Sequence, residues 1–364
     1  MLAMLSILAL ISFLAVTGLS RVYHAQRASL GDRWYSRGVA DLNAKQYGAA
    51  VTDFHAALLY SRDEYSYQLS LAEALIGLGH TGEAFAYLLN LWDREPENGL
   101  VNLELARIVG QRDQIDQAVR YYHNAVYAAW PTGQESKRRE ARLELIEFLL
   151  RAKRQGDAQA ELMALSANAG DEPSVQQTVA DLFIRAGNYE RALEAYRTIL
   201  KTDDHNAAAL AGAGNAAFQL GRYPLAQQYL DSATRINPND TESTQRLHMT
   251  EMVLGMDPFR PQISPADRNK NVIDAFVIAG QRLNTCPQLS RDTFGAAGSA
   301  PSLLDEWSSL KPQITEAGLH RKPDLAQSAM DLVFRIERQT STVCGTPTGT
   351  DLALLLISKL HEGS

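Results

Sequence analysis

Along most of this chain, apolar positions recur with the spacing of amphipathic helices that follow one another in pairs. An alanine recurs at an equivalent place in each pair. The interval between these alanines is 34 residues except once, where six extra residues around Pro131 lengthen it to 40. A repeat of this length is typical of stacked two-helix units. The pattern predicts six units over residues 31–240, marked by Ala50, Ala84, Ala118, Ala158, Ala192 and Ala226.

Small residues in the first helix of a unit, such as Gly38 and Gly214, are expected to let its two helices approach closely. Pro96 and Pro238 follow second helices and cannot continue them. A single unit cannot bury its apolar face alone, so neighbouring units are expected to stack. We therefore assign these small residues to the core and not to a site.

The units resemble the tetratricopeptide repeat, a helix–turn–helix of 34 residues. The sixth unit carries the resemblance best, and the third and fourth depart from it with Asp113 and Lys153 where a turn glycine is usual. The resemblance implies a superhelical solenoid with a concave groove, and the layout is similar to bacterial membrane-anchored repeat proteins of envelope assembly. The matching residues of the sixth unit are Leu210, Gly214, Gly221, Arg222, Tyr223, Ala226, Leu230, Ala233 and Pro238.

The resemblance also implies which side chains face the groove, because fixed positions of each first helix do so in this family. Their mixed character suits an extended peptide or a partner helix. Some members clamp a carboxylate with a lysine at one of these positions, and this chain has no lysine there, which argues against that ligand. The groove residues are Tyr35, Leu69, Glu73, Leu103, Arg107, Leu143, Glu147, Asp181, Arg185, Asn215 and Phe218.

The first twenty residues contain no charged side chain and are almost all apolar. About twenty such residues in a helix span a bilayer, so residues 1–20 are predicted to be a single-pass anchor. A cleaved signal peptide is the alternative, but no basic residue precedes the apolar run. Arginines follow it from Arg21 onward, and the positive-inside rule then places the soluble part in the cytoplasm. A missing basic leader would reverse that orientation.

The last third, residues 241–364, breaks the period but is still helical in pattern. Asp240 and Ser264 are predicted to cap two helices, a long helix follows Pro323, and a last one runs over residues 351–360. No alternating strand pattern occurs anywhere in the sequence. The predicted class is all-α: a transmembrane helix, a six-repeat solenoid and a C-terminal helical cap domain, which resembles no family that we recognise.

The net charge and the two cysteines limit the kinds of partner and the cellular compartment that we expect. The chain has 35 Lys and Arg against 42 Asp and Glu, a net charge of −7, so nucleic acid is not an expected partner. A basic cluster over residues 137–154 is interleaved with glutamates and is interpreted as a solvated face. The two cysteines, Cys286 and Cys344, could meet if the helices that precede them pack antiparallel, but for a cytoplasmic domain we expect free thiols.

Candidate catalytic motifs are weak. Gly212-Ala213-Gly214 mimics a dinucleotide loop but lies within a predicted repeat helix, and the loop after Cys344 lacks the arginine of a cysteine phosphatase. The eight histidines show no metal-ligand spacing. No cofactor, metal, catalytic residue or small-molecule substrate is therefore expected.

These observations together predict a membrane-tethered scaffold that binds a protein or peptide partner in its groove. The alternative is an enzyme or enzyme subunit with a site in the C-terminal domain near Cys344.

Overall fold

The computed structural model describes residues 2–130, 133–167, 172–286, 289 and 302–362, and for most of residues 2–25 it describes the backbone alone. Every regular element in these ranges is helical, and no strand occurs among them, so the all-α prediction is confirmed. The chain divides into two compact units, residues 1–165 and 166–364. Each unit is described by itself.

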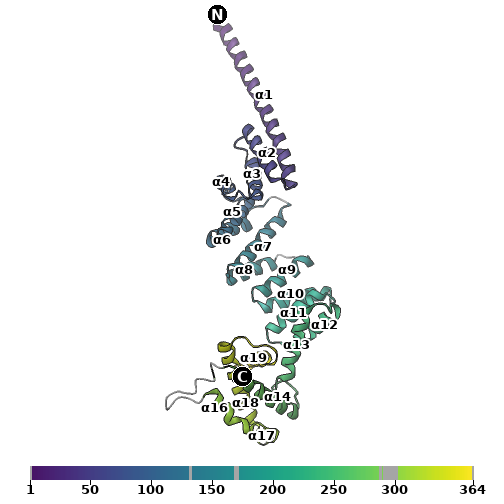
Figure 1. The fold of residues 1–364 in the computed structure, drawn as a ribbon. Helices are drawn as coiled ribbons and strands as arrows, with labels where there is room; N and C mark the ends of the chain where they lie inside the picture. Colours follow the sequence, from purple (N-terminus) through teal and green to yellow (C-terminus); the bar gives the residue numbers. More distant parts are fainter. Residues whose placement is uncertain (1, 131–132, 168–171, 287–288, 290–301, 363–364) are drawn as a thin grey trace. The chain divides into compact units, whose positions relative to one another are not determined.

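The first unit is a series of helices in which each packs on the next from α1 to α7 (Figure 1). Predicted small residues lie where helices meet: a Cβ on Gly38 would come within 2.7 Å of the Phe54 ring. The helices are α1 (Leu2–Asn43), α2 (Tyr47–Tyr60), α3 (Tyr65–Leu78), α4 (Thr81–Arg94), α5 (Gly99–Gln111), α6 (Ile115–Tyr127), α7 (Glu135–Arg151) and α8 (Gln155–Ala167).

Turns of the first unit keep one backbone geometry whether or not glycine is present. Gly79 ends α3 in the left-handed region with φ of 88°. Asp113 and Lys153, which replace the usual glycine, have φ of 56° and 58°. The third and fourth repeats therefore retain the turn at a steric cost that a glycine would avoid.

The second unit begins with two helix pairs that pack in sequence and then continues into a C-terminal bundle. The predicted caps are confirmed: the Asp240 and Ser264 side chains accept hydrogen bonds of 3.1 Å from the amides of Ser243 and Asp267. The helices are α9 (Pro173–Arg185), α10 (Tyr189–Thr202), α11 (Ala207–Gln219), α12 (Tyr223–Ile236), α13 (Thr241–Met256), α14 (Pro265–Asn284), α16 (Leu303–Leu310), α17 (Glu316–Arg321), α18 (Asp324–Cys344) and α19 (Gly349–Leu360), with a 3-10 turn η1 (Lys311–Gln313).

The C-terminal bundle is built on α14 and α18, with α19 packed on both and α13 packed on α19. Trp307 of α16 stacks on Phe276, with ring centroids 5.6 Å apart, and donates a 2.9 Å hydrogen bond to the Phe276 carbonyl. Tyr223 of α12 and Val253 of α13 belong to the same apolar cluster. One core therefore joins the last repeat to the bundle.

The prediction of two free thiols is wrong, because Cys286 and Cys344 form a disulfide with their Cα atoms 5.9 Å apart. The C-terminal ends of α14 and α18 meet at this bond. Residues 265 and 323, at their N-terminal ends, line one common pocket. The two helices thus run side by side in the same direction, which brings together cysteines that are 58 residues apart in sequence.

The predicted anchor falls within α1, which is a continuous helix from Leu2 to Asn43. Most side chains of residues 1–20 lie outside the described part of the chain. Within the described part, none of the helices combines the length and the apolar composition that crossing a membrane requires. The anchor stays a prediction.

Candidate partner-binding pockets

The first unit contains a pocket of about 990 Å³ formed mainly by α5, α6 and α7. Arg107, Leu143 and Glu147, all predicted groove residues, line it. Tyr122 and Phe148 also line it; their ring centroids are 5.6 Å apart, and the two residues are 4% and 8% exposed. The pocket therefore combines an apolar wall with charged groups, as a groove for a peptide requires.

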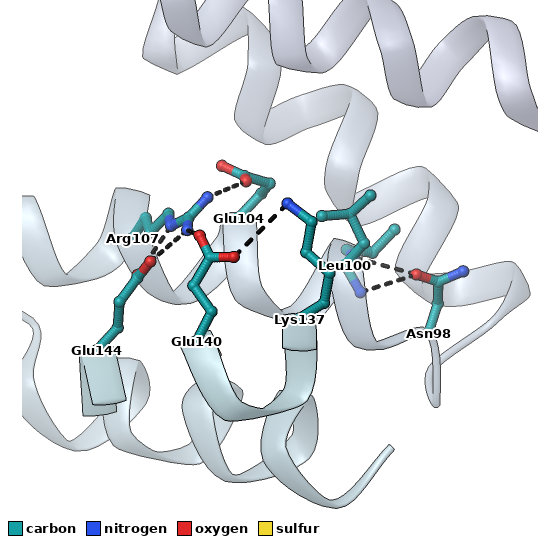
Figure 2. A network of polar contacts seen from close by, with 8 residues as sticks. Asn98, Leu100, Glu104, Arg107, Lys137, Glu140 and Glu144 are labelled. Atoms are coloured by element: carbon teal, nitrogen blue, oxygen red, sulfur yellow. Dashed lines mark hydrogen bonds and ion pairs between the residues drawn. The ribbon is translucent and has the colours of Figure 1, made fainter. Parts of the chain in front are cut away.

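Arg107 is the centre of a network of ion pairs that joins α5 to α7 (Figure 2). Its Nε donates a 2.9 Å hydrogen bond to Glu144 Oε2, and its other nitrogens contact Glu104, Glu144 and, at 3.5 Å, Glu140. Lys137 Nζ lies 3.6 Å from the second oxygen of Glu140. In Figure 2, Glu140 and Glu144 reach Arg107 from one side, and Glu104 lies on its other side.

This network neutralises Arg107 within the protein. The hydrogen bond with Glu144 contributes most to raising the pKa of Arg107. Burial raises the pKa of Glu104, and the Arg107 charge opposes that rise. Reversing the charge at Arg107 would place a fourth carboxylate among three, so such a variant tests the packing of α5 on α7 before it tests recognition.

Another arginine of the pocket, Arg151, is better placed to meet a partner. Arg139 and Arg151 both line it, and Arg151 is exposed. They belong to the basic cluster that was interpreted as a solvated face. Arg142 of that cluster is not solvated, because its side chain is 13% exposed and pairs at 3.2 Å with Glu161.

A second pocket, of about 390 Å³, lies in the second unit and brings together Asp181, Arg185 and Asn215. Asp181 accepts hydrogen bonds of 2.5 Å from the Tyr196 hydroxyl and 3.1 Å from Gln177. Burial, and then the bond to Asp181, raise the pKa of Tyr196, which stays protonated. The buried amide oxygen of Asn215 has no hydrogen-bond partner within the described residues.

The remaining predicted groove residues lie outside these two pockets. Tyr35 stacks on Tyr67 at 4.8 Å between ring centroids, and Leu103 is 1% exposed. Leu69 packs on the apolar cluster of α2 to α5, and burial raises the pKa of Glu73. Phe218 meets Tyr223 edge-to-face at 5.5 Å.

Sequence reasoning missed Tyr122 and Phe148. Tyr122 lies on the second helix of its unit, whereas the groove prediction took residues from first helices alone. Phe148 lies on a first helix, α7, but one residue beyond Glu147, which was chosen. An aromatic residue next to a groove position would have been the signal for Phe148, and no such signal points to Tyr122.

The two sequence motifs that mimic cofactor or catalytic loops have structural explanations. A Cβ on Gly212 would lie 2.2 Å from the Tyr196 ring, so this glycine allows α10 and α11 to pack. The sulfur of Cys344 is bonded to Cys286 and is not available as a thiolate nucleophile. Within the described residues, no three His, Cys, Asp or Glu side chains gather as a metal site would require.

A known protein is similar in sequence to part of this chain. The DnaJ homolog subfamily C member 3 homolog of Dictyostelium discoideum is 25% identical over 109 residues. The match covers 30% of this chain and spans only 22% of that relative. It leaves most of both proteins unmatched.

The solved structures that resemble this chain are less similar to it in sequence than this relative is. YrrB, described as a TPR protein with an unusual peptide-binding site, is 16% identical with a TM-score of 0.42, over 53% of this chain and 96% of that one. The pilF protein of Pseudomonas aeruginosa is 18% identical with a TM-score of 0.42, over 60% of this chain and 97% of that one. Similarity at this level carries no inference about function.

The family comparison concerns the region from the end of α9 to the first half of α13. Residues 183–248 match the family model described as tetratricopeptide repeat. This region contains the α11–α12 pair, whose sequence carried the resemblance best. Residues 183–248 therefore match the repeat family that the sequence resembles.

Proposed function

We propose that this chain is a membrane-tethered scaffold that binds a protein or peptide partner in the pocket of its first unit. The observation that carries the proposal is the 990 Å³ pocket, in which the Tyr122 and Phe148 rings lie beside side chains of both charges. Apolar anchors of a partner segment would pack against Leu143 beside these rings, and its polar groups would meet the rim.

The structure suggests which side chains to alter. Leu143 and Arg151 line the pocket on α7, and neither takes part in the Arg107 network. Arg120 is exposed on α6 and does not line the pocket, so it serves as a matched control. Charge reversal at Arg151 is expected to weaken binding, whereas the same reversal at Arg120 leaves it unchanged.

The experiment is site-specific photo-crosslinking in cells. A crosslinking residue replaces Leu143 in one strain and Arg120 in another, and captured proteins are identified by mass spectrometry. We expect a defined partner at position 143 alone, and its loss in an Arg151→Glu background. Identical products at both positions, or products indifferent to Arg151→Glu, would contradict the assignment of the pocket.

The tether and its orientation are a separate part of the proposal. The uncharged run of residues 1–20 supports an anchor. The disulfide between Cys286 and Cys344 supports a soluble part on the oxidising side of the membrane, opposite to the orientation that the arginines predict. A role in envelope assembly would suit that location.

Two measurements test the tether. The full chain is expected in the membrane fraction, and a chain beginning at residue 29 in the soluble fraction. Alkylation of the denatured, non-reduced protein is expected to label neither cysteine until a reductant is added. Two labelled cysteines without reductant would restore the cytoplasmic orientation.

A further inference from the structure

The C-terminal bundle contains a pocket of about 610 Å³. It is formed by the connection between α13 and α14, the first turns of α14, the end of α17 and the start of α18. None of the predicted groove residues lines it. The pocket therefore requires an explanation independent of the partner-binding function.

Two arginines, Arg260 and Arg268, line this pocket together with His320. Among the described residues that line it, none is an aspartate or a glutamate. None of the three forms an ion pair within the described part of the chain. In a protein of net charge −7, the lining of this pocket therefore carries positive charge and no negative charge.

The two arginines retain donors for a ligand. Arg260 uses Nη1 in a 3.2 Å hydrogen bond to the Leu254 carbonyl, which orients the guanidinium. Arg268 lies over the Phe259 ring at 5.9 Å, and its buried Nε has no hydrogen-bond partner within the described residues. A buried donor without a partner is costly unless a ligand or water supplies an acceptor.

The surrounding backbone favours the same ligand charge. Helices α14 and α18 both begin at this pocket, and the N-terminal end of a helix carries a partial positive charge. Asp267 and Asp324 lie in those first turns but do not line the pocket, and Asp267 is hydrogen-bonded to Ser264. Phe259 and Leu319 add apolar wall beside the cationic groups.

We propose that this pocket binds the phosphate group of a small anionic ligand, with Arg260 and Arg268 as its charged donors and the His320 ring beside them as a further hydrogen-bonding group. Guanidinium groups bind phosphate through paired hydrogen bonds, and two of them suit a doubly charged group. The ligand is either a soluble phosphate ester or the headgroup of an anionic phospholipid. This assignment departs from the sequence-based expectation that the chain has no small-molecule ligand.

Calorimetric titration of the full chain in mild detergent tests the proposal. The probes are glycerol 3-phosphate and short-chain phosphatidylglycerol below its micelle concentration, with short-chain phosphatidylcholine as the lipid control. Binding of glycerol 3-phosphate identifies a soluble ester, and binding of phosphatidylglycerol alone identifies a headgroup. Arg268→Gln and Arg260→Gln are each expected to weaken binding about tenfold or more.

Arg235→Gln is the matched control, because Arg235 is exposed on α12, pairs with Asp231 and does not line this pocket. It is expected to bind as the unaltered chain does. If the glutamine variants do not fold, binding is measured with Arg268→Lys instead, because this variant keeps the positive charge but loses the guanidinium group. Absence of binding by both phosphate probes would overturn the proposal, as would equal affinities for the unaltered chain and the pocket variants.

Discussion

Arg282 of α14 donates a 2.8 Å hydrogen bond to the main-chain carbonyl of Gly345, the residue that ends α18. The disulfide between Cys286 and Cys344 joins the same two helix ends. Two turns earlier in α18, Glu337 is fully buried, and neither of its carboxylate oxygens is hydrogen-bonded within the described residues. The disulfide and the Arg282 hydrogen bond thus join the ends of α14 and α18, and the buried carboxyl group of Glu337 lies in the same pair of helices.

The disulfide is expected to stabilise the C-terminal bundle. Replacing Cys286 and Cys344 together by serine should lower the free energy of unfolding by about 4 kcal/mol, because the bond closes a loop of 58 residues in the unfolded chain. Urea unfolding with and without reductant measures the effect. The unaltered chain should respond to reductant, and the double variant should not. Coincident unfolding curves for all four samples would show that the bond contributes nothing.

Stability of the bundle is expected to fall as pH rises. Burial raises the pKa of Glu337 to about 8, the charge of Asp351 adds to the rise, and Arg282 opposes it. Between its ordinary value of 4.5 and about 8, the folded chain keeps a proton that the unfolded chain has lost. The stability that the protonated Glu337 contributes to the folded chain is therefore complete below pH 4.5 and is lost as pH rises through 8.

Glu337→Gln tests this pH dependence, because glutamine keeps the shape without the charge. The variant should be more stable at pH 8 by an amount on the order of a few kcal/mol. Its unfolding free energy should depend less on pH, with a residual slope from Asp351, whose pKa burial also raises. Glu251→Gln, on an exposed position of α13, is the control and should keep the full slope. Equal slopes for both variants would argue that Glu337 does not hold the proton.

The ion-pair network of the first unit is expected to be strongly coupled. Arg107→Gln should destabilise that unit by about 1–3 kcal/mol, because it leaves the Glu104 carboxylate buried without its cation. Glu104→Gln in the same chain should recover part of the loss. A double-mutant cycle from thermal unfolding gives the coupling energy. Additive effects of the two substitutions would mean that the pair is not energetically linked.

The close approach of α14 to Trp307 is expected to tolerate only glycine at position 280. A Cβ there would lie 2.2 Å from Trp307 Cζ2, so Gly280→Ala must displace the ring from Phe276. We expect a loss of about 1–3 kcal/mol. Gly255→Ala is the matched control, because open space surrounds that position near the end of α13, and it should be neutral or stabilising by up to ~1 kcal/mol. Similar unfolding midpoints for the two variants would contradict the packing argument.

The apolar periodicity and the capping residues were sufficient to predict the helix pairs. Ala50, Ala84 and Ala118 are fully buried as expected, and Asp240 and Ser264 begin the helices assigned to them. These features are local, because residues three or four positions apart share a helix face and a cap bonds to its own first turn. The sequence alone therefore determined which segments are helical and which small residues lie between them.

Only the tertiary structure decided which side chains pair with one another and which remain available to a ligand or partner. Arg107 looked like a groove residue, and it is neutralised because α7 brings Glu140 and Glu144 to it. Cys286 meets Cys344 because α14 and α18 run in the same direction. Arg260 and Arg268 share a pocket with His320 for the same reason. Each grouping joins residues from helices far apart in sequence, and periodicity carries no information about which faces of such helices meet.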